Sequence, residues 1–145
     1  MTTHPIPALT VAGTVRNGLA WLAASLLSGL TIVVGFAIVG GIEAGRLDPL
    51  DDEFLSALVP GSFFIGLYVA VLTVLPTIAL TWVRRAAGWY GLPAHLLMGA
   101  LTGAAAIQIF GFPLQYGLEG LPMTGFFAAT GLIGGAVYWR LSARP

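Results

Sequence analysis

The sequence contains no cysteine and no lysine, and only 8% of its 145 residues are charged. The absence of cysteine excludes disulfides, thiolate metal sites and a cysteine nucleophile. The six basic residues, all arginines, equal the six acidic residues in number, so no net positive charge is available to attract nucleic acid. Soluble domains carry about 25% charged residues, and this chain has too few to cover a surface that faces water.

Hydrophobic residues take the place of the missing charge: they make up 57% of the chain, and the mean hydropathy is +0.91. A lipid bilayer is the solvent that suits this composition, provided that backbone polar groups are satisfied within helices or a closed barrel. Apolar runs of about 20 residues favour helices, because barrel strands would be about half as long and would alternate. The sequence therefore predicts an all-α protein, an integral membrane four-helix bundle with a single domain.

The four predicted transmembrane spans cover residues 19–42, 62–83, 94–112 and 123–141. The first is longer than the apolar region of a secretory signal, about 7–15 residues, so we expect a retained span. Pro60 and Gly61 are expected to separate a short interfacial piece from the second span. The spans leave two outer loops, 43–61 and 113–122, and a turn at 84–93 that we place in the cytoplasm.

Charged residues segregate between the two sides of this arrangement. The side that holds both termini and the turn contains five arginines: Arg16, Arg84, Arg85, Arg140 and Arg144. The other side contains Arg46 and all six acidic residues. Because cytoplasmic segments carry an excess of basic residues, we expect both termini in the cytoplasm.

Small residues recur one helical turn apart in three spans and predict close helix packing. They are Ala20, Ala24 and Ser28 in the first span, Gly99 and Gly103 in the third, and Gly131 and Gly135 in the fourth. Such faces let backbones approach each other within lipid, where helices associate through van der Waals contact. They serve either packing within the monomer, which a four-span protein needs, or a dimer or partner interface.

Polar groups within the spans are few and uncharged. Thr73, Thr77 and Thr81 lie one turn apart on the second span, where Pro76 is expected to bend the helix. Their hydroxyls either bond back to carbonyls of the preceding turn or line a cavity or pathway. Gln108 in the third span is expected to form a hydrogen bond to another helix. No ionisable side chain lies deep in a predicted span, which disfavours proton relays, ion-coupled transport and voltage sensing.

Aromatic and basic residues form a belt at the turn and at the end of the last span. Its members are Arg84, Arg85, Trp89, Tyr90, His95, Trp139 and Arg140. The simplest interpretation is contact with lipid headgroups. Alternatively, the part around His95 holds a quinone, a lipid phosphate or a haem edge. Bis-histidine haem ligation is disfavoured because the only other histidine is His4, and a zinc site would need three or four ligands. We assign no catalytic residue, metal or cofactor.

The last predicted span carries a weak resemblance to known proteins. Its run from Gly131 to Arg140, rich in small residues and closed by Tyr138, Trp139 and arginine, looks like the last span of short, uncharacterised four-span inner-membrane proteins of proteobacteria. The use of arginine alone as the basic residue, with abundant alanine and glycine, is similar to proteins from GC-rich genomes. The resemblance implies that the protein lies in a bacterial inner membrane, and it implies no activity.

The absence of a catalytic motif beside several helix-packing faces predicts a non-catalytic protein, an accessory or assembly subunit of a membrane complex or a homo-oligomer. Its partners would be the lipid bilayer and either itself or another membrane protein, without nucleic acid. One alternative is a small dimeric transporter or channel that uses the Pro76 bend and the threonine face. The other is a lipid- or quinone-handling membrane enzyme that uses His95 with Arg84 or Arg85 and requires a cleft beside His95.

Overall fold

The computed structural model describes residues 11–45, 52–109 and 114–142, without the side chains of Arg85 and of residues 114–116. This part of the chain is all-helical and contains no strand, which confirms that the protein is all-α, as predicted. Its elements are α1 (Val11–Glu43), α2 (Asp52–Ala86), α3 (Leu92–Gln108), the 3-10 helix η1 (Leu114–Gly120) and α4 (Leu121–Leu141). His4, Arg46, Arg144 and the predicted end of the third span at residue 112 lie outside the described residues.

Three of the helices, α1, α2 and α4, are long and apolar enough to cross a membrane. Their surfaces carry large apolar side chains in the open: Val59, Leu75 and Trp82 are each about three-quarters exposed. Such side chains would lose their hydrophobic stabilisation in water but are well solvated by hydrocarbon. Helix α3 has 17 residues and is therefore about 26 Å long.

The helices extend beyond the predicted spans, and the predicted break at Pro60 and Gly61 is wrong. Helix α1 begins at Val11 rather than at Leu19, and α2 runs without interruption from Asp52 through Pro60 and Pro76. A proline inside a helix removes one backbone hydrogen bond. Ending the helix there would leave up to four carbonyls without partners in an apolar solvent, so continuing it costs less.

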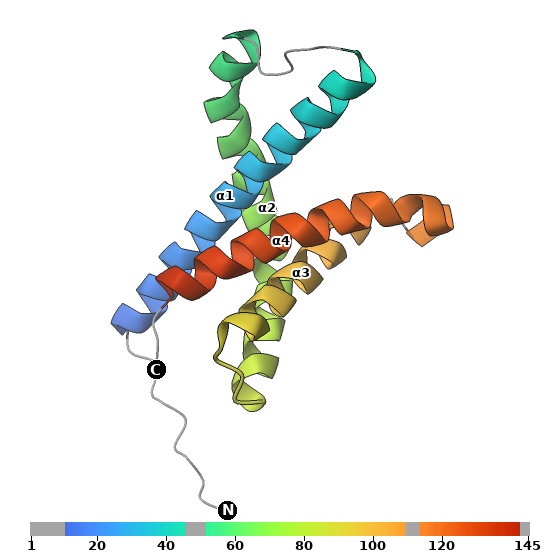
Figure 1. The fold of residues 1–145 in the computed structure, drawn as a ribbon. Helices are drawn as coiled ribbons and strands as arrows, with labels where there is room; N and C mark the ends of the chain where they lie inside the picture. The colour runs from blue at the N-terminus through green and yellow to red at the C-terminus, as the bar shows by residue number, and fades with distance from the viewer. Residues whose placement is uncertain (1–10, 46–51, 110–113, 143–145) are drawn as a thin grey trace, which may run out of the picture.

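The four α-helices form two pairs that cross each other (Figure 1). Helix α3 packs most extensively on α4, and α1 packs on α2; the contact between α1 and α4 is smaller, and that between α2 and α3 is the smallest of the four. The start of α1 meets the end of α4, where Arg16 Nε donates a hydrogen bond of 2.9 Å to the Leu141 carbonyl. The α2–α3 turn lies toward the same side of the molecule in Figure 1, and the end of α1 and the start of α2 lie at the opposite side.

The predicted glycine faces of α3 and α4 meet each other. A Cβ atom added to Gly99 would overlap the carbonyl oxygen of Gly131, and one added to Gly135 would overlap the carbonyl oxygen of His95. A Cβ atom on Gly103 would likewise overlap a carbonyl oxygen of α4. The structure therefore uses both GxxxG faces for packing within the monomer.

The small-residue face of α1 packs on α4 in the same way. Ala20, Ala24 and Ser28 are buried. Ser28 Oγ donates a hydrogen bond of 3.5 Å to the Thr130 carbonyl, and a Cβ atom on Gly134 would come within 2.8 Å of Ser28 Oγ. This face therefore joins the two helix pairs.

A fourth small-residue face, on α2, was missed in the sequence. Ser62, Gly66 and Ala70 lie one turn apart and are buried against α1. A Cβ atom on Gly66 would lie 2.7 Å from the Cα of Leu26, and one on Gly29 would overlap the backbone of Gly66. The spacing of the three residues would have predicted this face by the rule that identified the other three.

Candidate functional site

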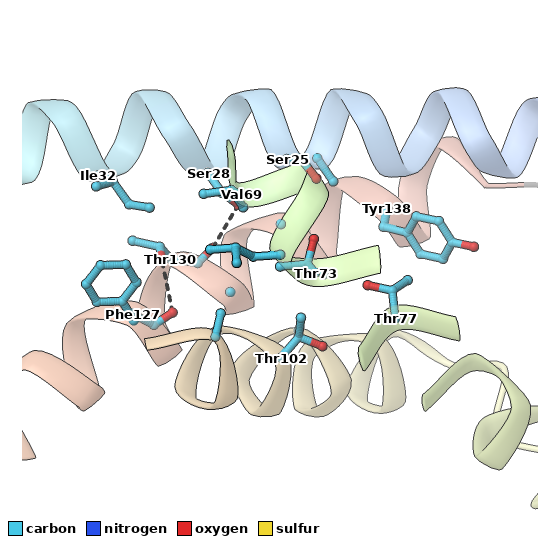
Figure 2. A pocket seen from close by; sticks show the side chains of 18 of the residues that line it. Ser25, Ser28, Ile32, Val69, Thr73, Thr77, Thr102, Phe127, Thr130 and Tyr138 are labelled. Carbon is cyan, nitrogen blue, oxygen red and sulfur yellow. Dashed lines mark hydrogen bonds between the residues drawn. The ribbon is translucent and has the colours of Figure 1, made fainter. Parts of the chain in front are cut away.

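A cavity of about 490 Å³ lies between the helices and is lined by residues of all four (Figure 2). It exists because the glycine faces bring α1 close to α2 and α3 close to α4, whereas α2 and α3 touch least. Figure 2 shows Val69 and Thr73 of α2 between Ser28 of α1 and Thr102 of α3. The cavity is thus a product of the way the two helix pairs cross.

The predicted threonine face of α2 lines this cavity. Thr73, Thr77 and Thr81 are all among the lining residues, whereas Pro76 is not. Thr73 Oγ1 also donates to the Ala70 carbonyl at 3.4 Å, so this threonine both bonds to the preceding turn of its helix and lines the cavity.

Hydroxyl groups of the other helices follow the same pattern. Thr102 Oγ1 donates to the Met98 carbonyl at 2.8 Å, and Thr130 Oγ1 donates to the Phe127 carbonyl at 2.9 Å. Because these hydroxyls are engaged with their own helices, most of the surface they offer to the cavity is apolar.

The cavity has a polar end, built around His95 at the start of α3. His95 is only 5% exposed. Its Nδ1 lies 2.9 Å from the Gly91 carbonyl and its Nε2 lies 2.5 Å from Nη1 of Arg84. Arginine has donors only, so Nε2 must accept and Nδ1 must carry the hydrogen that Gly91 accepts. This hydrogen bonding requires the neutral form of His95. The hydrogen bond from Arg84 to His95 joins the end of α2 to the start of α3.

Aromatic rings surround this polar end. The Tyr138 ring of α4 lies 5.9 Å from the His95 ring, centroid to centroid. The Arg84 guanidinium lies over the Tyr90 ring at 5.6 Å, a favourable cation–π distance. Arg84, His95 and Tyr138 all line the cavity, so the polar side chains of this cluster lie at one end of it.

Trp21 of α1 adds a hydrogen-bond donor without an acceptor. Its Nε1 atom is buried and has no hydrogen-bond partner among the described residues, and the side chain lines the cavity. The Ala24 carbonyl lies near Gly134, and Arg16 bonds to Leu141. These two contacts align α1 with α4. Trp21 lies between Arg16 and Ala24 in α1, so it lies opposite the part of α4 between Gly134 and Leu141, which contains Tyr138.

The opposite end of the cavity is apolar. Ile32 and Phe127 lie there, away from Tyr138 and Thr77 (Figure 2). Phe36, also in the lining, contacts Phe127 edge-on at a centroid distance of 6.4 Å. From Trp21 to Phe36 the axis of α1 rises about 22 Å. The cavity is therefore elongated and its walls are almost entirely apolar, with Trp21, Arg84, His95 and Tyr138 gathered at one end.

Four residues of the predicted belt, Trp89, Tyr90, Trp139 and Arg140, do not line the cavity. Trp89 and Tyr90 are exposed, Trp139 is half-buried, and Arg140 is exposed. The side chain of Arg85 lies outside the described residues. Of the belt side chains that the structure describes, Arg84 and His95 line the cavity, and Tyr90 contacts Arg84.

Gln108 lies away from the cavity and joins two helices. Its Nε2 atom donates to Thr124 Oγ1 of α4 at 3.4 Å and to the Ala104 carbonyl at 3.3 Å. This hydrogen bond between α3 and α4 is the role predicted for Gln108 from the sequence.

Two contributors to the polar end, Trp21 and Tyr138, were not predicted as site residues. Tyr138 belongs to the aromatic end of the last span, which gave a signal without a role, and Trp21 stands within an apolar run that gave none. Among the described residues, no group of three or more histidine, aspartate or glutamate side chains is placed to hold a metal ion.

Comparison with known proteins adds no assignment to this geometry. No family model, no curated protein and no solved structure matches the chain.

Proposed function

We propose that the chain is a non-catalytic integral protein of a bacterial inner membrane that binds a hydrophobic molecule in the cavity between its helices. The observation that carries this proposal is the cavity itself, because all four helices contribute to its lining. Binding pockets for small molecules have volumes of about 300–1,000 Å³ and mostly apolar walls, and this cavity of about 490 Å³ falls within that range.

The proposal includes four spans with both termini in the cytoplasm. Helix α3, with 17 residues, meets the lower limit of about 17–25 residues for a span. Arg16, Arg84 and Arg140 lie near the start of α1 and the ends of α2 and α4, which Figure 1 shows toward one side of the fold. Glu43, Asp52 and Glu53 lie at the end of α1 and the start of α2, at the opposite side. The excess of basic residues in cytoplasmic segments supports placing the arginine side in the cytoplasm.

The walls favour a hydrophobic ligand over a transported ion or polar solute. A pathway for ions needs charged rings, carbonyl rings or a water-filled pore. Here Ser28 and the lining threonines with assigned hydrogen bonds donate to backbone carbonyls, and most of the remaining lining side chains are apolar. A hydrocarbon chain fills such a space without losing hydration.

The arrangement of His95 supports binding rather than catalysis. A general base needs a nitrogen within hydrogen-bond reach of the substrate. Both ring nitrogens of His95 already have partners, the Gly91 carbonyl and Arg84. His95 therefore has a structural role at the polar end of the cavity. We propose that the chain is an accessory subunit that presents the bound molecule to a partner protein in the membrane.

A substitution that fills the cavity tests this proposal. Thr102→Phe places a ring in the middle of the cavity, whereas Leu101→Phe places the same ring on the adjacent position, which is 48% exposed. The probe is a photoactivatable diazirine analogue of hexadecanol in phosphatidylcholine nanodiscs, and the signal is the labelling that excess hexadecanol competes away. We expect Thr102→Phe to lower that signal at least fivefold and Leu101→Phe to leave it unchanged. Equal signals in the three proteins would refute binding in the cavity.

A further inference from the structure

We propose that the cavity selects a single-chain amphiphile with an anionic head, a fatty carboxylate, and holds that head at the end formed by Trp21, Arg84 and Tyr138. This inference rests on the proposed function and adds to it the charge, the orientation and the chemical class of the ligand. Its basis is the chemistry of the polar end, which is separate from the size of the cavity.

The Trp21 indole supplies the first argument. A buried tryptophan N–H usually finds an acceptor, because an unpaired polar group in an apolar setting is costly. Trp21 Nε1 is buried without a partner among the described residues, and its side chain lines the cavity. An oxygen of a bound molecule would satisfy this donor. The ligand must therefore present an acceptor at the level of Tyr138.

The charge of Arg84 supplies the second argument. Arg84 supplies the positive charge among the described residues that line the cavity. Electrostatic attraction is strong where water is scarce, so this lining favours an anion over a neutral head. Hydrogen bonds to a carboxylate are also about twice as strong as those to a neutral oxygen.

The shape of the cavity sets the orientation and the number of chains. A head at Arg84 leaves the tail to run past Thr73 and Thr102 toward Ile32 and Phe36. The volume of about 490 Å³ corresponds to one drug-sized molecule and is small for a lipid with two buried acyl chains. Since the arginine end of the fold is the proposed cytoplasmic side, the head would lie at the level of the inner leaflet.

Matched photoactivatable probes test the inference. Diazirine analogues of hexadecanoic acid and hexadecanol share one chain and differ in the head, and a decyl-substituted benzoquinone in competition supplies a neutral carbonyl head. In phosphatidylcholine nanodiscs, at a pH where the acid is ionised, we expect competed labelling by the acid to exceed that by the alcohol at least tenfold. The quinone should compete at least tenfold more weakly than hexadecanoate. Equal labelling by acid and alcohol, or stronger competition by the quinone, would overturn the assignment of an anionic head.

Two substitutions locate the head. Trp21→Phe keeps an aromatic ring and removes the N–H donor, and Arg84→Gln removes the charge. Each should lower the ratio of acid to alcohol labelling about tenfold, while labelling by the alcohol shows that the cavity is intact. If either protein no longer binds the alcohol, Arg84→Lys, which keeps the charge, should retain the preference for the acid. An unchanged ratio in Trp21→Phe would contradict the position of the head.

The same experiment separates this inference from the proposed function. If Thr102→Phe leaves the competed labelling by both probes unchanged, the cavity is not the binding site and both proposals fail. If Thr102→Phe abolishes labelling by both probes but the unsubstituted protein does not distinguish them, only the anionic head is wrong.

Discussion

Replacing Gly131 by alanine is expected to destabilise the folded protein by about 1–3 kcal/mol, the usual cost of adding volume to a tightly packed site. The added Cβ would overlap the carbonyl oxygen of Gly99 on α3, which is backbone and cannot rotate away. The helices would have to separate at the point where both glycine faces meet. The free energy of unfolding in bicelles, measured by steric trapping, gives the size of the loss.

Gly125→Ala is the matched control, because it makes the same change in the same helix. A Cβ atom on Gly125 would meet nothing within 4 Å. Alanine favours a helix over glycine by about 0.5–1 kcal/mol, so this protein should be slightly more stable than the original. The two substitutions should therefore change the free energy of unfolding in opposite directions. Similar changes in both proteins would show that α3 and α4 do not pack through these glycines.

Replacing His95 by alanine is the second substitution with a large expected effect, about 2–3 kcal/mol of lost stability. The change removes the acceptor of Arg84 and the donor to the Gly91 carbonyl, and it leaves a space beside the Tyr138 ring. An unsatisfied buried polar group costs about 1–3 kcal/mol, and lost packing adds to it. The same steric-trapping measurement in bicelles gives the loss.

Two further substitutions separate the contributions at His95. His95→Phe keeps a ring beside Tyr138 but loses both hydrogen bonds, so its stability should fall between those of His95→Ala and the original protein. Leu97→Ala lies on the same helix at a position that is 49% exposed, and it should change stability by less than about 0.5 kcal/mol. If His95→Ala were as stable as Leu97→Ala, the histidine would not connect the helices.

The helix-packing faces could be predicted from the sequence because their signal is local. Gly99 and Gly131 each belong to a pair of glycines at a spacing of four, and that spacing places both members on one side of a helix. The face of Ser62 and Gly66 had the same spacing. It was missed because it begins directly after the predicted break at Pro60 and Gly61, where a helix end was expected.

The cavity could not be predicted in the same way. Its existence depends on how far α2 and α3 stand apart, which follows from the crossing of the two helix pairs and from no spacing within one helix. Trp21 illustrates the difficulty, because its apolar neighbours in the sequence indicate only a membrane span. Only when the surrounding helices are in place is it evident that its N–H has no hydrogen-bond partner within the described part of the chain.

Single cysteines introduced into this cysteine-free chain test the central claim that four helices cross the bilayer with the arginine end in the cytoplasm. Glu53→Cys, Ala87→Cys and Glu119→Cys replace exposed residues at the start of α2, in the α2–α3 turn and in η1. In intact cells, a membrane-impermeant maleimide should label the Glu53→Cys and Glu119→Cys proteins from outside. It should label the Ala87→Cys protein only after the membrane is opened. Labelling of Ala87→Cys from the same side as Glu53→Cys, or of Glu119→Cys only from the side of Ala87→Cys, would contradict the four-span account.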